Sequence, residues 1–176
     1  TDFKQLCRKA DIAMYRAKED GRNNFHYYDD SLDQDRSDQF ELLQRLRQAL
    51  NEQEFELYYQ PIIDLKTKSV TAVEALIRWQ QPDGSMIGPD QFIPLAESSG
   101  LINALGRWVI RQACKDCALW RQQGFSSLSV AINLSVVQFK DGLLPTTIAD
   151  NLKEFGLSGD ALELELTESL LIEESE

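Results

Sequence analysis

From residue 69 to residue 166, segments with the pattern of β-strands alternate with segments with the pattern of helices. A strand–helix–strand–helix–strand order favours a parallel sheet with helices packed outside it. The glycine-rich sequences GxGxxG and GxxxxGK[ST], which bind phosphate in many open sheets, do not occur in the chain. The order therefore favours an α/β fold of the closed (β/α)8 barrel type. The predicted strands are 69–76, 128–134 and 162–166, and the predicted helices are 92–97, 104–122 and 143–155.

The part of the chain before this alternation follows other patterns. Residues 55–59 predict a strand, and residues 64–68 predict a turn that leads into the next strand. Residues 29–38 are polar and acidic and indicate a linker, after which an apolar stripe predicts a helix that runs to about Glu52. The stripe consists of Phe40, Leu43, Leu46 and Leu50, and Ser37 or Asp38 is the expected N-cap.

The first thirty residues cannot form a domain by themselves. Residues 9–20 predict a helix that ends at Gly21, and Phe25–Tyr28 predict a short strand. One helix and one strand bury too little surface to be stable, so we expect them to pack on a segment upstream of this chain. The predicted regions are a domain remnant at 1–30, a linker and connecting helix at 31–53, and part of a barrel at 54–176. The connecting helix either docks on the barrel or couples two domains through a dimer.

The chain is strongly acidic, with a formal net charge of −11. This charge argues against binding to nucleic acid polymers, which requires a basic face. An acidic protein can still bind a phosphate ester if divalent cations lie between its carboxylates and the phosphate. The chain has no apolar run of roughly 18 residues and no signal peptide, so we expect a cytoplasmic location, with membrane attachment only through segments outside this chain.

The chain has three cysteines and one histidine, residue types that can form a metal site or a redox-active disulfide. Cys114 and Cys117 have CxxC spacing, but they fall in the middle of a predicted helix, whereas redox CxxC motifs usually open a helix. A zinc site would need further ligands, and His26 has no Cys or His near it in the sequence. We therefore interpret the two cysteines as packing residues and His26 as a surface or packing residue. The low, odd number of cysteines indicates a reducing compartment.

Three oxygen-bearing side chains are predicted near the carboxyl ends of successive strands: Glu74, Asn133 and Glu165. Active sites of parallel barrels gather at these strand ends. Side-chain alternation puts Asn133 and Glu165 on the face opposite the aliphatic residues, which would be the inside of a barrel. Two carboxylates and an amide are ligands suited to Mg²⁺ or Mn²⁺.

A plainer interpretation of the same pattern remains open. The run Leu162–Leu166 alternates leucine with glutamate, which is also typical of an antiparallel strand with one solvated face. In that case Glu163 and Glu165 would simply face water. The pattern alone favours neither interpretation.

Five motifs in one order identify a resemblance to a known family. They are YQPI at 59–62, EALIRW at 74–79, FIPLAE at 92–97, INLS at 132–135 and ELELTE at 163–168. Together they resemble the EAL domain, over about residues 40–176. Residues 10–18 and the GRN sequence at 21–23 resemble the closing stretch of a GGDEF domain, although the GGDEF signature itself lies outside this chain.

The resemblance implies a fold, an activity and residue roles. EAL domains are barrels that hydrolyse cyclic di-GMP to linear pGpG with two divalent metal ions, here expected to be Mg²⁺ or Mn²⁺. By resemblance, Glu74, Asn133 and Glu165 would be metal ligands, and Glu168 would hold a nearby loop. Arg78 would contact a substrate phosphate, and Gln60 and Leu76 would line the nucleotide site. Upstream sensor or GGDEF domains and a second copy of the chain are the implied protein partners.

The family pattern continues beyond residue 176, with an adjacent Asp pair, a Lys and a further Glu that complete the two-metal site. A typical barrel needs about 250 residues, so this chain would supply the first half. We therefore expect the chain by itself to be inactive, and its sheet edge to favour dimerisation or aggregation. Two alternatives to a phosphodiesterase remain: a degenerate EAL domain that only binds cyclic di-GMP and signals to a partner, and an unrelated metal-dependent barrel enzyme or purely structural domain.

Overall fold

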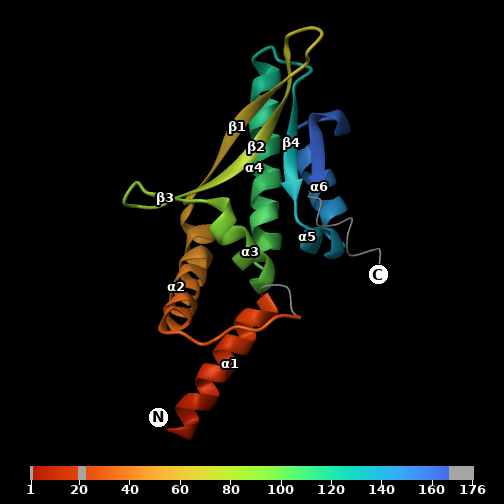
Figure 1. Cartoon of the computed structure of the whole chain (residues 1–176). Helices are drawn as coiled ribbons and strands as arrows, with labels where there is room; N and C mark the ends of the chain where they lie inside the picture. The colour runs from red at the N-terminus through yellow and green to blue at the C-terminus, as the bar shows by residue number, and fades with distance from the viewer. Residues whose placement is uncertain (1, 20–22, 167–176) are drawn as a thin grey trace. The chain divides into compact units, whose positions relative to one another are not determined.

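The computed structural model describes residues 2–19 and 23–166, with the backbone alone described at 19 and 30–36 (Figure 1). The chain divides into two compact units, Thr1–Arg45 and Leu46–Glu176. The predicted region boundaries at 30 and 53 do not coincide with this division, and they stay a prediction.

The first unit contains α1 (Phe3–Glu19) and most of α2 (Asp30–Glu52). The predicted start of the connecting helix at Ser37 or Asp38 is wrong, because α2 begins at Asp30 and includes the residues expected to be a linker. Polar residues do not prevent a helix when their propensities are only mildly unfavourable. The predicted strand at Phe25–Tyr28 is also absent: the segment is irregular, and Phe25 packs edge-on against Tyr27 with ring centroids 5.4 Å apart.

The second unit is built on one sheet. Its strands are β1 (Phe55–Ile63), β2 (Val70–Gln80), β3 (Met86–Ile87), β4 (Ser129–Leu134) and β5 (Leu162–Leu166). Their order is β1-β2-β4-β5, with the short β3 paired to the end of β2. β1 and β3 run antiparallel to β2, whereas β2, β4 and β5 are mutually parallel. The predicted alternation of parallel strands and helices is therefore confirmed.

The connections between the parallel strands are helical. α3 (Pro89–Ser99) and α4 (Ile102–Gln122) join β2 to β4, while α5 (Val136–Lys140), α6 (Leu144–Glu154) and a short 3-10 turn, Gly159–Ala161, join β4 to β5. α3 ends at Gly100, whose φ of 76° requires the left-handed conformation that glycine adopts easily. Figure 1 shows α4 lying along the sheet and α6 beside β4.

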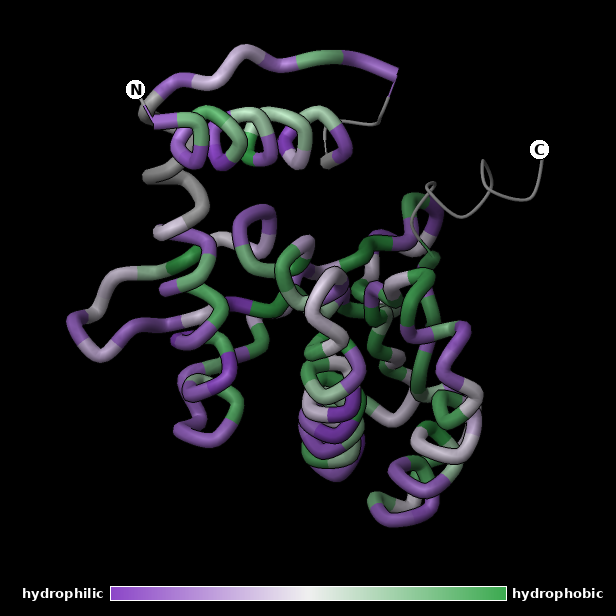
Figure 2. The backbone as a smooth tube through the Cα atoms, turned by 90° about the horizontal axis from the view of Figure 1, so that it is seen from below, coloured by the Kyte–Doolittle hydropathy of each residue, from purple (hydrophilic) through white to green (hydrophobic). Residues whose placement is uncertain are grey.

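One face of the sheet packs on α4 and α6. The core there contains β2 and β4 side chains together with Ile110, Ala113, Cys114 and Cys117 of α4 and Leu144 of α6. Figure 2 looks along the axis of α4 and shows both hydrophobic and hydrophilic residues around its turns, as an amphipathic helix requires. The β2 and β4 members are Val73, Ala75, Val130, Ile132 and Leu134. The helices bury the outer strand less completely, because Leu164 and Leu166 of β5 are exposed.

The cysteine pair belongs to this core. Cys114 and Cys117 are fully buried and have free thiols, while Cys7 is exposed. Burial, together with the nearby Cys117, raises the pKa of the Cys114 thiol to about 11, which disfavours the reactive thiolate. The structure thus agrees with the packing interpretation of the CxxC spacing. Within the described residues, no helix is long and apolar enough to cross a membrane.

A second, aromatic cluster surrounds the far end of β2. Trp79 and Phe92 are fully buried, and Phe55 packs against both, with ring centroids 5.6 and 5.8 Å away. The Trp79 indole donates to a Glu54 carboxylate oxygen at 2.9 Å. These contacts extend β2 to Gln80, four residues beyond the predicted end at Leu76.

The prediction that Glu74 lies near the end of its strand is therefore wrong, although Glu74 does lie near the end of the part of β2 that pairs with β4, Ala72–Ala75.

Candidate functional site

The face of the sheet opposite α4 carries the polar residues that the sequence singled out. Successive side chains on a strand point to opposite faces, so residues in register across the strands share one face. The pairs Gln60 with Glu74, Glu74 with Ala131 and Ala131 with Glu163 form one row across four strands. We call this side of the sheet the polar face. Ala131 is fully buried, whereas Gln60 and Glu163 are exposed.

Further along the polar face, Tyr58 pairs in register with Leu76, and Asn133 pairs with Glu165. Asn133 is directly opposite Glu165 in the β4–β5 register, and both side chains are exposed. The Asn133 amide donates from Nδ2 to Oε1 of Glu74 at 2.7 Å. The structure therefore brings Asn133 next to both Glu74 and Glu165, as predicted, although the three residues come from different strands.

The strand directions decide one of the alternatives that the sequence left open. β5 is parallel to β4, so the antiparallel version of the solvated-face interpretation is wrong. The other part of that interpretation, that these glutamates face water, agrees with the structure, because Glu163 and Glu165 are exposed. In the part of the chain described, no group of three or more His, Cys, Asp or Glu residues is close enough to hold a metal ion. Any cation site at Glu74 and Glu165 thus depends on the amide of Asn133.

The donor set fits a hard cation in its chemistry. Asn133 uses its amide nitrogen on Glu74, and its carbonyl oxygen is the atom that a cation would bind. Carboxylate and amide oxygens are the ligands that Mg²⁺ and Mn²⁺ prefer. The exposure of Asn133 and Glu165 leaves the site open to a substrate.

The predicted substrate contacts lie on the same face or beside it. Gln60 pairs in register with Glu74, and Leu76 and Arg78 follow Glu74 on the same side of β2. Arg78 is half-buried: its guanidinium lies over the Tyr58 ring at 5.5 Å from the centroid and donates to the Ile77 carbonyl. Glu168, predicted to hold a loop, lies outside the described residues.

A cavity of about 260 Å³ opens beside Leu76, Arg78 and Asn133. It lies between the strand ends and the two helices that follow β2, so its walls are mostly apolar. Polar groups enter it from Glu97 of α3, Ser135 and Gln138. Residues of α3 and α4 that line it include Ile93, Ile102, Leu105 and Gly106.

Ser135, Gln138 and Glu97 are residues near the site to which the sequence analysis assigned no role. Ser135 caps α5, and the Ser135-x-x-Gln138 spacing forms a capping box in which each side chain binds the other residue's backbone. That four-residue signal was visible in the sequence. The contact of Ser135 with Glu97, at 2.5 Å, joins residues 38 positions apart and had no local signal.

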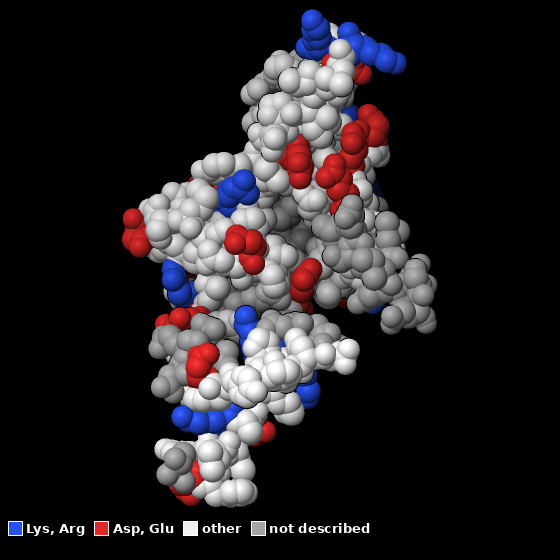
Figure 3. All heavy atoms as spheres, in the orientation of Figure 1, with Lys and Arg blue, Asp and Glu red and all other residues white. Residues whose placement is uncertain are grey.

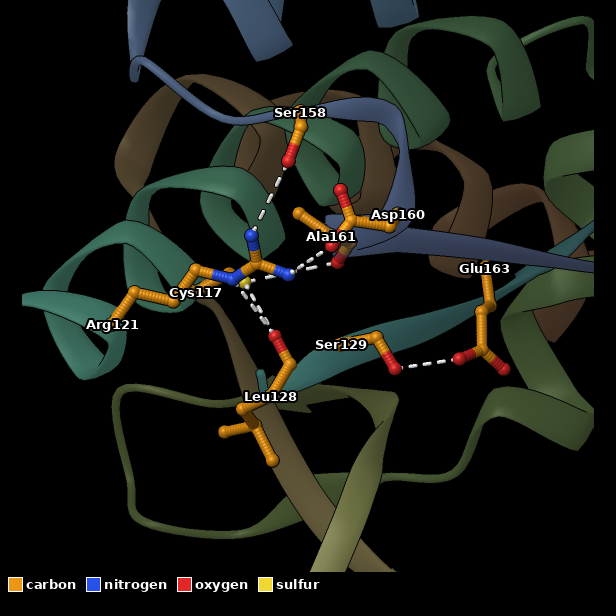
Figure 4. Close-up of polar contacts among 8 residues, drawn as sticks. All are labelled: Cys117, Arg121, Leu128, Ser129, Ser158, Asp160, Ala161 and Glu163. Atoms are coloured by element: carbon orange, nitrogen blue, oxygen red, sulfur yellow. Dashed lines mark hydrogen bonds and ion pairs between the residues drawn. The ribbon is translucent and has the colours of Figure 1, made fainter. Parts of the chain in front are cut away.

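The amino ends of β4 and β5 are held together by a different cluster (Figure 4). Arg121, in the last turn of α4, donates to the Leu128 carbonyl at 3.0 Å and to the Asp160 carboxylate at 3.1 Å. Hydrogen bonds from Ser158 and Arg121 keep the pKa of Asp160 below its ordinary value. On the polar face, the Ser129 hydroxyl donates to Glu163 at 2.5 Å. These contacts fix the two strands in register at the end away from Asn133.

The charges of the second unit are unevenly placed. The turn between β1 and β2 carries Lys66 and Lys68, and Figure 3 shows basic side chains at this tip, at the top of the view. Acidic side chains gather lower in the same view, near the strands of the sheet. The acidic character expected from the net charge thus includes the region of the candidate site.

Comparison with known proteins gives a consistent result. Residues 43–176 match the family described as EAL domain. The chain is 38% identical over 172 residues to the bifunctional diguanylate cyclase/cyclic di-GMP phosphodiesterase MucR of Pseudomonas aeruginosa, covering 98% of this chain and 25% of that protein. It is 40% identical over 176 residues to the cyclic di-GMP phosphodiesterase PdeR of Escherichia coli, covering 100% of this chain and 26% of that protein.

A solved structure agrees with these relatives. The PaMucR phosphodiesterase in its c-di-GMP complex matches with a TM-score of 0.71 and 39% identity, over 75% of this chain and 53% of that chain. The chain spans only 20% to 26% of the length of the curated relatives it matches.

Proposed function

This chain belongs to the EAL domain family, and from that premise we propose that it forms part of a phosphodiesterase that hydrolyses cyclic di-GMP to linear pGpG. One observation carries the proposal: Glu74, Asn133 and Glu165, from three parallel strands, meet on the polar face beside the EAL sequence. Relatives named as cyclic di-GMP phosphodiesterases match nearly the whole chain, which supports the same reaction here.

We propose that Glu74, Asn133 and Glu165 hold Mg²⁺ or Mn²⁺. When bound, such ions offset the negative charge of a phosphodiester and make water nucleophilic near neutral pH. A cation there would also explain how a chain of net charge −11 accepts an anionic dinucleotide. The two carboxylates and the amide would then set the position of the reacting phosphate.

The residues around this trio supply binding and orientation. Arg78 is the candidate for a phosphate contact, because its guanidinium is already ordered over Tyr58 and lines the cavity at the strand ends. Leu76 offers an apolar surface to a guanine base, and Gln60 offers an amide from the neighbouring strand. Glu168 keeps the loop-holding role that the family resemblance implies.

The wider organisation is also a proposal. We assign residues 54–176 to the first half of a (β/α)8 barrel, and residues 1–30 to the end of a GGDEF domain. The match to MucR, named as both cyclase and phosphodiesterase, extends over 172 residues and so includes part of the chain before residue 43. We place the protein in the cytoplasm, as a homodimer coupled to upstream domains.

The test is calorimetric binding of cyclic di-GMP to the full-length protein with Mg²⁺ or Mn²⁺, followed by chromatography of the products. We expect binding of cyclic di-GMP and release of pGpG, and we expect Asn133→Ala to lose the release of pGpG. Glu154→Gln, on the exposed side of α6, is the matched control and should behave as the wild type. Binding without turnover in the wild type would instead identify a cyclic di-GMP receptor, and absence of binding would reject the substrate.

A further inference from the structure

The strand end that carries Asn133 is fixed by Glu97 of α3 and by the side chains of Ser135 and Gln138, the two members of the α5 capping box. Ser135, two residues after Asn133, is almost completely buried and is the N-cap of α5. Its hydroxyl oxygen accepts from the Val137 backbone N–H at 3.2 Å. A hydroxyl has one hydrogen to donate, and that hydrogen goes to Oε1 of Glu97 on α3, 2.5 Å away.

Gln138 holds the same segment from the other side. The Ser135 backbone N–H donates to Oε1 of Gln138 at 3.0 Å, and the Gln138 side chain is buried. Its Nε2 lies against Gly106 of α4, only 1.7 Å from the place where a Cβ at that position would be. The residue after β4 is therefore bound to α3 through Glu97, and its capping partner is packed on α4.

Asn133 has little else to hold it. Its side chain is exposed, and its amide is bonded to Glu74, which is itself one of the candidate ligands. The position of the amide thus follows from the backbone at the end of β4. Glu97, Ser135 and Asn133 also border the same cavity of about 260 Å³, so the strand end has space to move into if the Glu97 contact is lost.

We propose that Glu97 is a positioning residue. By accepting a hydrogen bond from the Ser135 hydroxyl, it fixes the end of β4, so that Asn133 faces Glu74 and Glu165 in the geometry that a divalent cation requires. The inference rests on the proposed function. Glu97 does not bind the cation; it acts through Ser135 and the backbone of Leu134. Residues that orient metal ligands commonly change metal affinity by about 10- to 100-fold when they are removed.

The test compares Glu97→Ala with Glu97→Gln in the full-length protein, with Mn²⁺ binding followed by electron paramagnetic resonance. Glu97→Ala removes the acceptor, and we expect Mn²⁺ to bind about 10-fold more weakly. Glu97→Gln keeps an oxygen acceptor, and its affinity should stay within about twofold of the wild type. In hydrolysis assays, Glu97→Ala should lower kcat more than it raises KM, because the substrate contacts at Leu76 and Arg78 remain.

Two controls test whether the effect is specific to the contact between Glu97 and Ser135. Ser98→Ala changes the neighbouring exposed residue, whose hydroxyl bonds only within α3, to the Leu95 carbonyl. Glu154→Ala removes the exposed pair with Arg111 that links α6 to α4. Both should bind Mn²⁺ as the wild type does. If Glu97→Ala does not fold, Glu97→Asp replaces it, since the shorter carboxylate is withdrawn from Ser135, with the same expected loss.

The outcomes distinguish this inference from the function on which it rests. Unchanged Mn²⁺ affinity in Glu97→Ala, or equal losses in Glu97→Ala and Glu97→Gln, would overturn the positioning role while leaving the phosphodiesterase proposal in place. Equal loss in Ser98→Ala or Glu154→Ala would also overturn it, because the effect would then not be specific to the contact between Glu97 and Ser135. A wild-type protein that binds no Mn²⁺ would overturn both.

Discussion

The two faces of the sheet differ in almost every physical respect. On the face toward α4, Val130, Ile132 and Leu134 of β4 are buried in an apolar core. On the polar face of the same strand, Asn133 is exposed and contacts a carboxylate from β2. Neighbouring residues of one six-residue strand therefore differ in their surroundings: one face holds the fold together, and the other carries the residues to which we assign the chemistry.

The difference teaches where substitutions should act. Burial of apolar side chains is the main favourable contribution to folding, so changes on the α4 face should appear in stability. Exposed polar groups contribute little to stability, so changes on the polar face should appear in binding and turnover. Substitutions on the two sides of the sheet therefore either separate the two faces or show that they are coupled.

The sharpest comparison uses two adjacent residues. Ile132→Ala should lower the free energy of unfolding by about 2–5 kcal/mol, because it leaves a cavity in a fully buried position. Asn133→Ala should change it by less than about 0.5 kcal/mol, since the side chain is exposed. Urea denaturation followed by circular dichroism measures both values.

Activity should show the opposite order: Asn133→Ala should lose more activity than Ile132→Ala. In the full-length protein, Asn133→Ala should reduce cyclic di-GMP hydrolysis by more than about 100-fold, the upper range seen when a residue that merely supports a metal ligand is lost. Ile132→Ala should keep most activity at temperatures where it is folded. If Ile132→Ala were as inactive as Asn133→Ala while still folded, the division between the faces would be wrong.

The amino ends of the strands give the next largest effect. Arg121→Ala removes the bond to the Leu128 carbonyl and the ion pair with Asp160, and leaves that carbonyl without its guanidinium partner. We expect a loss of stability of about 1–3 kcal/mol. Metal affinity should not change, because Leu128 lies just before the start of β4, whereas Asn133 lies next to its last residue. Arg121→Lys, which cannot reach both partners at once, is the matched variant and should recover only part of the loss.

Alkaline pH should weaken the α4 face selectively. Burial, with hydrogen bonding and the charge of Asp116 acting in the same direction, raises the pKa of Tyr59, whose hydroxyl donates to Asp116 at 2.6 Å. The pKa of Cys114 rises from 9.0 to about 11. A raised pKa means that the folded state binds the proton more tightly. The stabilisation is then complete below the unfolded pKa and is lost as pH rises through the folded value.

We therefore expect stability to be flat with respect to these groups below pH 9 and to fall between pH 9 and about 11, first through Cys114. Denaturation midpoints measured from pH 7 to pH 11 test this. The double variant Tyr59→Phe/Cys114→Ala should start less stable and fall less steeply. A wild-type curve parallel to that of the double variant would show that neither group contributes.

The smallest effect is expected at the exposed surface of α4. Arg111 and Glu154 form a two-bond pair that is open to solvent, which lowers the pKa of Glu154 and raises that of Arg111. Solvent and salt screen such pairs. Glu154→Gln should hardly shift the melting temperature, and the shift should vanish in high salt. A large, salt-independent shift would mean that α6 depends on this contact.

The parallel strands could be predicted from the sequence because they are periodic. Alternation in Leu128–Leu134 and Leu162–Leu166, with amphipathic helices between them, is enough to predict parallel strands and a polar face with Asn133 and Glu165 on it. The end of β2 could not be predicted, since Trp79 is held by Phe55 and Phe92, which are distant in sequence. The start of α2 was missed because Ser37 and Asp38 are good caps whose presence does not require a helix to begin there.

The candidate site follows the same rule. Asn133 and Glu165 could be selected by strand position, whereas Glu74 was selected as lying near a strand end that the structure places at Gln80. The substrate came from resemblance to a family. The role of Glu97 could not be deduced, because its partner Ser135 is distant in the sequence and becomes its neighbour only in the fold. Local patterns predict elements and faces; contacts between elements require the structure.

The central claim is that Glu74, Asn133 and Glu165 bind a divalent cation on the polar face. Anomalous diffraction from crystals of the full-length protein grown with Mn²⁺ and cyclic di-GMP tests it most directly. The account predicts a manganese peak bounded by the oxygens of these three residues, and no peak there in Asn133→Ala. A peak coordinated elsewhere, with these side chains turned to solvent, would contradict it.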